Sequence, residues 1–173
     1  MKLLRLLVVA ALGSLVSACI TSEAPKFSPS SAVPALGSGG EYSLWEYAGG
    51  RYSSQGTLIA RLRPDGLYEF LTDEEPIPIS FHDLGNDLVV GQANISKIDN
   101  ARGTYGYMIL RRKDSDVFLH LLQCDAQPPD LLAAHRVDVR AKPNTCSIEG
   151  VIDPAKFFAA LPAGEPTFKM VPK

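Results

Sequence analysis

Histidines are the side chains in this 173-residue chain best suited to acid–base or metal chemistry. His82 precedes Asp83, which suits a base held by a carboxylate or half of a metal site. The competing interpretation of this pair is a polar loop at the end of a strand. His120 alternates with Phe118 and Leu122, so it faces either a ligand cavity or the surface of a sheet. We therefore keep His82 and His120 as candidate ligand-binding residues.

The third histidine, His135, follows a short helical pattern, where an imidazolium would meet the negative end of the helix dipole. Histidines spaced this widely do not match the ligand pattern of a zinc site, so we predict neither a metal nor a cofactor. The chain contains no GxSxG, HExxH, P-loop or GxGxxG motif. We assign no catalytic residue, and a hydrolase whose triad assembles from distant positions remains an alternative.

Aromatic residues are concentrated in segments with strand-like patterns. One interpretation is an apolar ligand pocket inside a barrel, as in lipocalin-like carriers. The other is that aromatic side chains fill the core of an ordinary β-protein, which the unmatched lipocalin sequence signature favours. The residues concerned are Trp45, Tyr47, Tyr52, Tyr68, Phe70, Phe81, Tyr105 and Tyr107.

The first nineteen residues form a pattern that concerns location. Lys2 and Arg5 precede an apolar stretch at positions 6–16, which is typical of a secretory signal and too short for a membrane-spanning helix. The segment Val16-Ser17-Ala18-Cys19 resembles the lipobox of bacterial lipoproteins. The resemblance implies that residues 1–18 are cleaved and that Cys19 becomes a lipidated N-terminus. Several fatty chains on one cysteine would anchor the protein to a membrane.

Residue 20 and the charge balance refine the expected location and partners. Ile20, rather than aspartate, follows the lipidated cysteine, which favours the outer membrane with the protein facing the periplasm. Cleavage would remove Lys2 and Arg5, leaving 15 basic residues against 19 acidic ones, a formal charge of about −4. Nucleic acid is therefore not expected as a partner, because phosphate binding needs a basic patch. The expected partners are the membrane, through the lipid, and an envelope protein.

Two of the three cysteines remain once Cys19 carries lipid. Cys124 and Cys146 are expected to form a disulfide in an oxidising compartment. In the chain-entropy model, a bridge of this span stabilises a fold by roughly 3 kcal/mol. The alternative, a reactive or metal-binding thiol pair, lacks the CxxC spacing.

Composition divides the mature chain into two parts. Residues 19–40 are rich in proline, serine and glycine, which predicts a lipidated N-terminus followed by a flexible tether. Residues 41–173 predict a single β-rich domain with C-terminal helices. Strands are expected at 42–47, 57–62, 67–71, 76–81, 88–92, 104–111 and 117–123.

Two further patterns shape the expected architecture. Pro78 lacks an amide donor, so its strand is expected at a sheet edge. Short helices are expected at 131–135 and 155–161, each after a proline. The fold class predicted is mainly β, an antiparallel β-barrel-like or curved sheet or sandwich with a short C-terminal helical appendage.

Three functions are compatible with these patterns. The leading hypothesis is a non-enzymatic, membrane-anchored envelope lipoprotein that acts as a binding or assembly module through its β-surface or an exposed strand edge. The first alternative is a lipocalin-like carrier of a small apolar ligand, and the second is a hydrolase.

Overall fold

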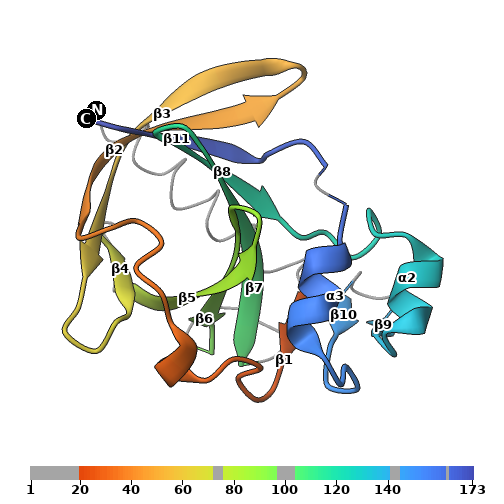
Figure 1. The fold of residues 1–173 in the computed structure, drawn as a ribbon. Helices are drawn as coiled ribbons and strands as arrows, with labels where there is room; N and C mark the ends of the chain where they lie inside the picture. Colours follow the sequence, from red (N-terminus) through yellow and green to blue (C-terminus); the bar gives the residue numbers. More distant parts are fainter. Residues whose placement is uncertain (1–19, 72–75, 97–103, 141–144, 163) are drawn as a thin grey trace.

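The computed structural model of the protein describes residues 20–71, 76–96, 104–140, 145–162 and 164–173. Eight antiparallel strands close into a barrel in the order β2-β3-β4-β5-β6-β7-β8-β11, with β11 pairing back to β2. The predicted β-rich class with a small helical appendage is confirmed (Figure 1). The elements in chain order are β1 (Ile20–Ser22), η1 (Pro29–Ser31), β2 (Gly39–Ala48), β3 (Arg51–Leu62), β4 (Tyr68–Leu71), β5 (Ile77–Gly85), β6 (Leu88–Asn94), β7 (Tyr105–Lys113), β8 (Asp116–Leu121), α2 (Pro129–Ala134), β9 (Asp138–Arg140), β10 (Thr145–Ser147), α3 (Pro154–Ala160) and β11 (Phe168–Pro172).

Tight turns explain why consecutive strands pair. Gly49 and Gly50 both have positive φ and link β2 to β3, and Asn86 and Asp87 do the same between β5 and β6. Two consecutive residues with positive φ match the hairpin turn whose twist suits antiparallel strands. The up-and-down order of the barrel therefore has a local origin in these turns.

The strand that contains Pro78 is not at an edge, so that expectation is wrong. β5 pairs with β4 on one side and β6 on the other. Pro78 is tolerated because it lies near the start of β5, opposite Glu69, where the ladder with β6 has not yet begun at Ile79. A proline at the beginning of a strand costs no ladder hydrogen bond on the side that is still unpaired.

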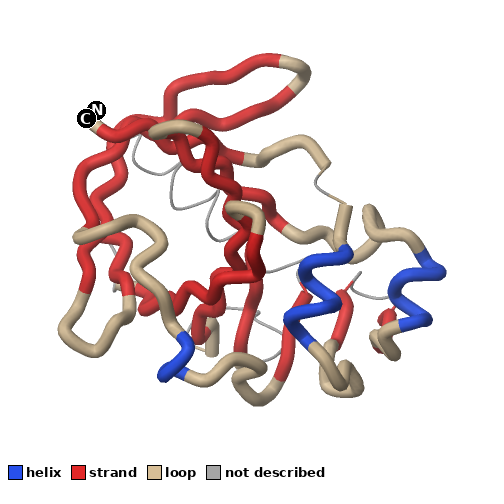
Figure 2. The backbone as a smooth tube through the Cα atoms, viewed as in Figure 1, coloured by secondary structure: helices blue, strands red, loops and turns tan. Residues whose placement is uncertain are grey.

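A second, smaller structural unit branches from the barrel wall. β1 pairs antiparallel with the start of β7 and parallel with β10, and β9 completes this branch. The expected disulfide is present between Cys124, after β8, and Cys146 in β10. It ties the branch to the end of a barrel strand. Helices α2 and α3 lie beside β9 and β10 on one side of the barrel (Figure 2).

Two hydrophobic cores hold these parts together. The first fills the barrel, and the second lies between the outer wall of the barrel and the appendage. Burial of this kind is the main stabilising term in folding. The second core includes Ile20, Leu88, Val90, Tyr107, Ile109, Leu122, Leu132, Ile148, Val151, Phe157, Phe158 and Leu161.

The segment expected to be a flexible tether is folded onto the barrel from residue 20 onward, which corrects that expectation. Ile20 is fully buried in β1, and Ala35 and Leu36 belong to the barrel core. Residues 23–38, which we call the strap, connect β1 to β2; their first part crosses the outer wall, and Ala35 and Leu36 near their end enter the barrel core. A proline- and serine-rich segment forms no core of its own, but here distant strands supply its partners. The signal and Cys19 lie outside the described residues.

Among the described residues, none of the helices is both long and apolar enough to cross a membrane.

Candidate functional site

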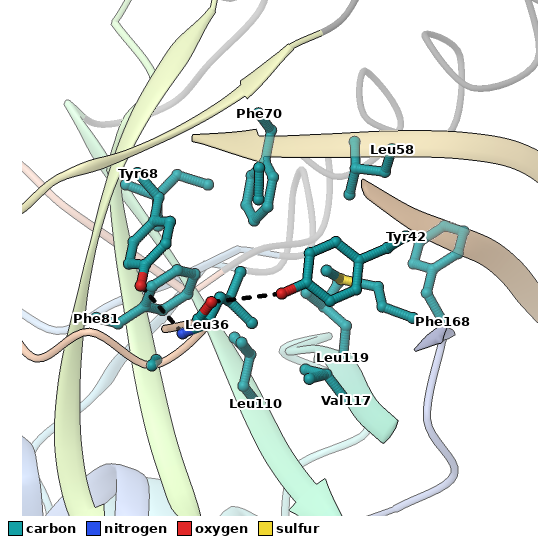
Figure 3. Packing of buried hydrophobic residues seen from close by; sticks show 14 of the residues in the cluster. Leu36, Tyr42, Leu58, Tyr68, Phe70, Phe81, Leu110, Val117, Leu119 and Phe168 are labelled. Atoms are coloured by element: carbon teal, nitrogen blue, oxygen red, sulfur yellow. Dashed lines mark hydrogen bonds between the residues drawn. The ribbon is translucent and has the colours of Figure 1, made fainter. Parts of the chain in front are cut away.

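The barrel interior is packed with side chains. Tyr68, Phe70 and Phe81 project into it and contact one another, with ring centroids 5.4 Å apart for Tyr68 and Phe81 and 6.4 Å apart for Phe70 and Phe81 (Figure 3). The Leu36 amide donates to the Tyr68 hydroxyl at 3.2 Å, so the end of the strap is fixed to this packing. A ligand in the lumen would have to displace these rings, so the accessible binding surfaces are those on the outside of the barrel.

His82 lies within β5 on the outer wall, not in the polar loop expected for His82-Asp83. Its Nδ1 lies 2.9 Å from Ser31 Oγ in the strap, and its Nε2 lies 2.8 Å from Ser80 Oγ. The Phe27 ring stacks on the imidazole, with centroids 4.8 Å apart. Burial lowers the pKa of His82, which favours the neutral imidazole. His82 is only 2% exposed, so it fastens the strap and is closed to a substrate.

Gln92 and Tyr107 hold the other half of the strap. The side-chain oxygen of Gln92 accepts from the amides of Lys26 at 2.8 Å and Phe27 at 3.0 Å, and its amide group donates to the Phe27 carbonyl at 3.1 Å. The Tyr107 hydroxyl accepts from the Lys26 amide at 3.3 Å and lies 2.6 Å from Ser22 Oγ in β1. Burial raises the pKa of Tyr107 to about 12, so this hydroxyl stays protonated and neutral. These bonds make the strap part of the domain.

Acidification is expected to destabilise the strap through His82. The folded-state pKa of His82 lies below its ordinary value of about 6.5, so the unfolded state takes up a proton first as the pH falls. The contribution of neutral His82 to the free energy of unfolding is complete above about pH 6.5 and is lost as pH falls toward the folded pKa. Urea denaturation across this pH range should show that the free energy of unfolding falls more steeply with falling pH for wild type than for His82→Gln. Equal pH dependence in both proteins would contradict this role.

His120 lies on β8 and faces outward, because its neighbours Val117 and Leu119 point into the barrel core. It is 7% exposed and lines a pocket of about 220 Å³ between the barrel and the appendage. Gln127 belongs to the same wall; its Nε2 donates to the Gln123 carbonyl, and its Oε1 has no hydrogen-bond donor among the described residues. A small polar molecule or water that donates a hydrogen bond suits such a wall. The pocket is lined by Leu88, Ile109, Arg111, His120, Leu121, Leu122, Gln123, Ala126, Gln127, Phe158, Leu161, Pro162, Gly164, Glu165 and Thr167.

The three histidines do not converge on one site. His82 lies under the strap, His120 lines the pocket, and His135 caps the end of α2 beside the Phe157 ring. Within the described ranges, no group of three or more histidine, cysteine or acidic residues is arranged to hold a metal ion.

The hairpin of β2 and β3 extends beyond the barrel wall and forms an arm, which we define as residues 45–54 (Figure 1). One face of this arm is aromatic. Tyr47 and Tyr52 are opposite each other in the register, with ring centroids 5.0 Å apart, and Trp45 is opposite Ser54. Tyr52 is 40% exposed, which is high for a large aromatic side chain. The arm therefore presents aromatic groups on a two-stranded support.

The opposite face of the arm is polar. Glu46 and Ser53 are opposite each other in the register, and the Gln55 amide donates to Glu46 Oε2 at 2.7 Å. Gln55 has no partner of its own in β2, because the register shifts at this point. An extra residue of this kind is a β-bulge, which increases the local twist of the hairpin.

One edge of the arm has no neighbouring strand among the described residues. β4 pairs with β3 only over Ile59–Leu62, whereas β2 pairs with β3 along almost its whole length. The edge from Arg51 to Leu58 therefore has no described strand beside it. A free edge is a template for pairing with another chain, and proline or lysine often blocks it. This edge, with the sequence RYSSQGTL, contains neither.

Comparison with known proteins identifies no relative: no family model, no curated protein and no solved structure matches the chain.

Sequence reasoning named Trp45, Tyr47 and Tyr52 but did not recognise the arm. The expected second strand began at residue 57, because residues 51–56 are rich in serine and glycine and lack the usual strand pattern. The missed signal was Gly49-Gly50, since a two-residue hairpin turn requires a partner strand immediately after it. For that reason the first six residues of β3, 51–56, were not predicted to be part of a strand.

Proposed function

We propose that the protein is a lipid-anchored envelope protein that acts as a non-enzymatic module and binds another envelope protein through its arm. The arm is the observation that carries this proposal. Exposed tyrosine and tryptophan side chains are enriched at the energetic centres of protein interfaces, because they bury a large area at little entropic cost. Here Trp45, Tyr47 and Tyr52 share one face, on which Tyr52 is exposed and Trp45 and Tyr47 are half-buried.

The interior of the barrel supports this function over the alternatives. A carrier that held its ligand in the lumen would need space that Tyr68, Phe70 and Phe81 occupy. A hydrolase built on His82 would need access to an imidazole that Phe27 covers. The anchor proposed at Cys19 gives the binding function its location, since lipid chains hold a protein at a membrane surface.

Photo-crosslinking in living cells tests the proposal. A benzophenone amino acid replaces Ala48, which is exposed at the tip of the arm. A discrete adduct with one envelope protein is expected after irradiation. The matched control places the same probe at Ser30, which is exposed in η1, on the opposite side of the barrel from the arm (Figure 2). Absence of a discrete adduct at Ala48, or an identical adduct at Ser30, would contradict the proposal.

A Tyr52→Ala substitution is expected to reduce the yield of the Ala48 adduct about tenfold, because truncating a central aromatic side chain commonly costs an interface 1–2 kcal/mol or more. Tyr52→Phe keeps the ring and should retain most of the yield. The measurement is the adduct intensity at equal protein level. Equal yields for Tyr52→Ala and wild type would exclude the aromatic face from the interface.

A further inference from the structure

The hydrogen bonds between β2 and the segment that contains β11 show in which direction the backbone groups of β2 point. The Tyr47 amide donates to the Thr167 carbonyl at 2.9 Å, and the Lys173 amide donates to the Glu41 carbonyl at 3.0 Å. Tyr47 and Glu41 therefore direct their backbone groups away from β3. Because the direction alternates along a strand, Ser43 and Trp45 do the same.

The residues of β3 opposite these positions must direct their own backbone groups away from β2. Where two opposite residues of an antiparallel pair are not hydrogen-bonded to each other, the backbone N–H and C=O groups of both point away from the partner strand. The register places Tyr52, Ser54 and Thr57 in this position. Their amides and carbonyls lie along the edge of β3 that no described strand covers. The bulge at Gln55 preserves this pattern, because the β2 partners of the three residues are evenly spaced.

We infer that an extended segment of the partner protein adds to the arm as a new strand alongside β3. This inference rests on the proposed function and specifies how the arm binds. Alternating donors and acceptors along Tyr52, Ser54 and Thr57 are complemented by another polypeptide backbone, as in recognition by strand addition. A segment of about five residues spans the three positions.

The two faces of the arm define the side chains of that segment. On the aromatic face, its residues would lie beside Tyr52, where apolar or aromatic side chains pack best. On the other face, they would lie beside Ser53 and the Gln55–Glu46 pair, which favours polar or basic side chains. The expected segment therefore alternates apolar and polar residues and contains no proline.

A separate segment fits the edge better than a second copy of the chain. In a two-copy pairing that covers all three positions in both copies, Tyr52 lies opposite Thr57, and Gly50 of one copy then lies opposite Ile59 of the other. Leu71 of β4 already pairs with Ile59 at that edge. A free segment avoids this overlap because it can end before Ile59.

Replacing Ser54 tests the inference, because the amide of Ser54 points to the free edge and makes no bond to β2. Ser54→Pro removes this donor and places a ring on the edge, whereas the control Ser54→Ala keeps the donor. In full-length protein in cells, Ser54→Pro should reduce the Ala48 adduct about tenfold or more, and Ser54→Ala should change it less than about twofold. An adduct that is unchanged in Ser54→Pro overturns strand addition while the proposed function stands. No adduct in wild type counts against the proposed function itself.

A second measurement covers the case in which Ser54→Pro does not fold, which circular dichroism would reveal. Linear peptides of about 12 residues, selected from a displayed random library on the full-length protein in detergent, serve as probes. Bound peptide should protect the amides of Tyr52, Ser54 and Thr57 of wild type from hydrogen exchange. Binding without protection of these amides overturns the inference. Protection that depends on protein concentration without peptide also overturns it, in favour of a second copy.

Discussion

A Cys19→Ser variant is expected to lose stable membrane anchorage while the β-barrel stays folded. The proposed lipid is attached through the Cys19 thiol, and serine offers no thiol for that bond. Each buried methylene contributes about 0.8 kcal/mol to membrane binding, so losing two or three chains removes essentially all of the anchor. The barrel should survive because both cores are formed by residues 20 onward.

The Cys19→Ser variant is tested by where the protein fractionates and by the chemical state of its N-terminus. Membrane fractionation and mass spectrometry of the N-terminus should find Cys19→Ser either released or as a precursor that keeps residues 1–18. Ser17→Ala keeps a small residue in the lipobox-like segment and serves as the control, with the same processing as wild type expected. Lipid-type processing and anchorage that are unchanged in Cys19→Ser would show that the lipobox assignment is wrong.

The fold would place a lipid on Cys19 close to the barrel. Ile20 is fully buried in β1 and directly follows Cys19, and consecutive Cα atoms are only about 3.8 Å apart. A flexible tether within residues 19–40 would let the domain lie far from the bilayer. With β1 in place, a lipid on Cys19 would hold the barrel close to the membrane surface.

A Phe158→Ala variant is expected to lower the free energy of unfolding by about 3–5 kcal/mol, the range for a buried phenylalanine. Phe158 is fully buried in α3 and lies where three parts of the protein meet. Its ring centroid is 5.1 Å from that of Tyr107 in the barrel wall and 6.0 Å from that of Phe27 in the strap. Truncation would leave a cavity between barrel, strap and appendage.

Urea denaturation of Phe158→Ala and of wild type measures this difference in the free energy of unfolding. The dependence of that free energy on urea concentration is compared as well. Lys156→Ala, on the exposed side of the same helix, should change the free energy of unfolding by less than about 0.5 kcal/mol. A single cooperative transition that shifts as a whole would indicate that the strap and appendage unfold with the barrel. A barrel transition unaffected by Phe158→Ala would contradict the shared core.

Local sequence patterns were sufficient wherever neighbouring residues decide the structure. The helix that begins after Asp153 was predicted from its capping residue and proline, and the Asp153 side chain does accept from the Lys156 amide. The turn at Arg63–Gly66 and the strands on either side of it were predicted for the same reason. Each of these elements depends on bonds within a few residues.

Local sequence patterns did not predict the structure of segments whose interaction partners lie far away in the chain. The strap has the composition of a linker, yet Gln92 and His82 bind it from more than fifty residues away. β1, β9 and β10 are each three residues long and exist only because they pair with one another and with β7. No local pattern encodes such pairing.

The candidate site shows the same division. The sequence by itself determined the aromatic residues of the arm, the Gly49-Gly50 turn and the lipobox-like segment, because residue type and short spacing carry these signals. Only the tertiary structure decided that Tyr52 lies on an exposed face and that, among the described residues, β4 pairs with β3 no further than Ile59. Closure of the barrel sets how far each strand is covered by its neighbours, and that coverage leaves the edge of the arm without a described strand beside it.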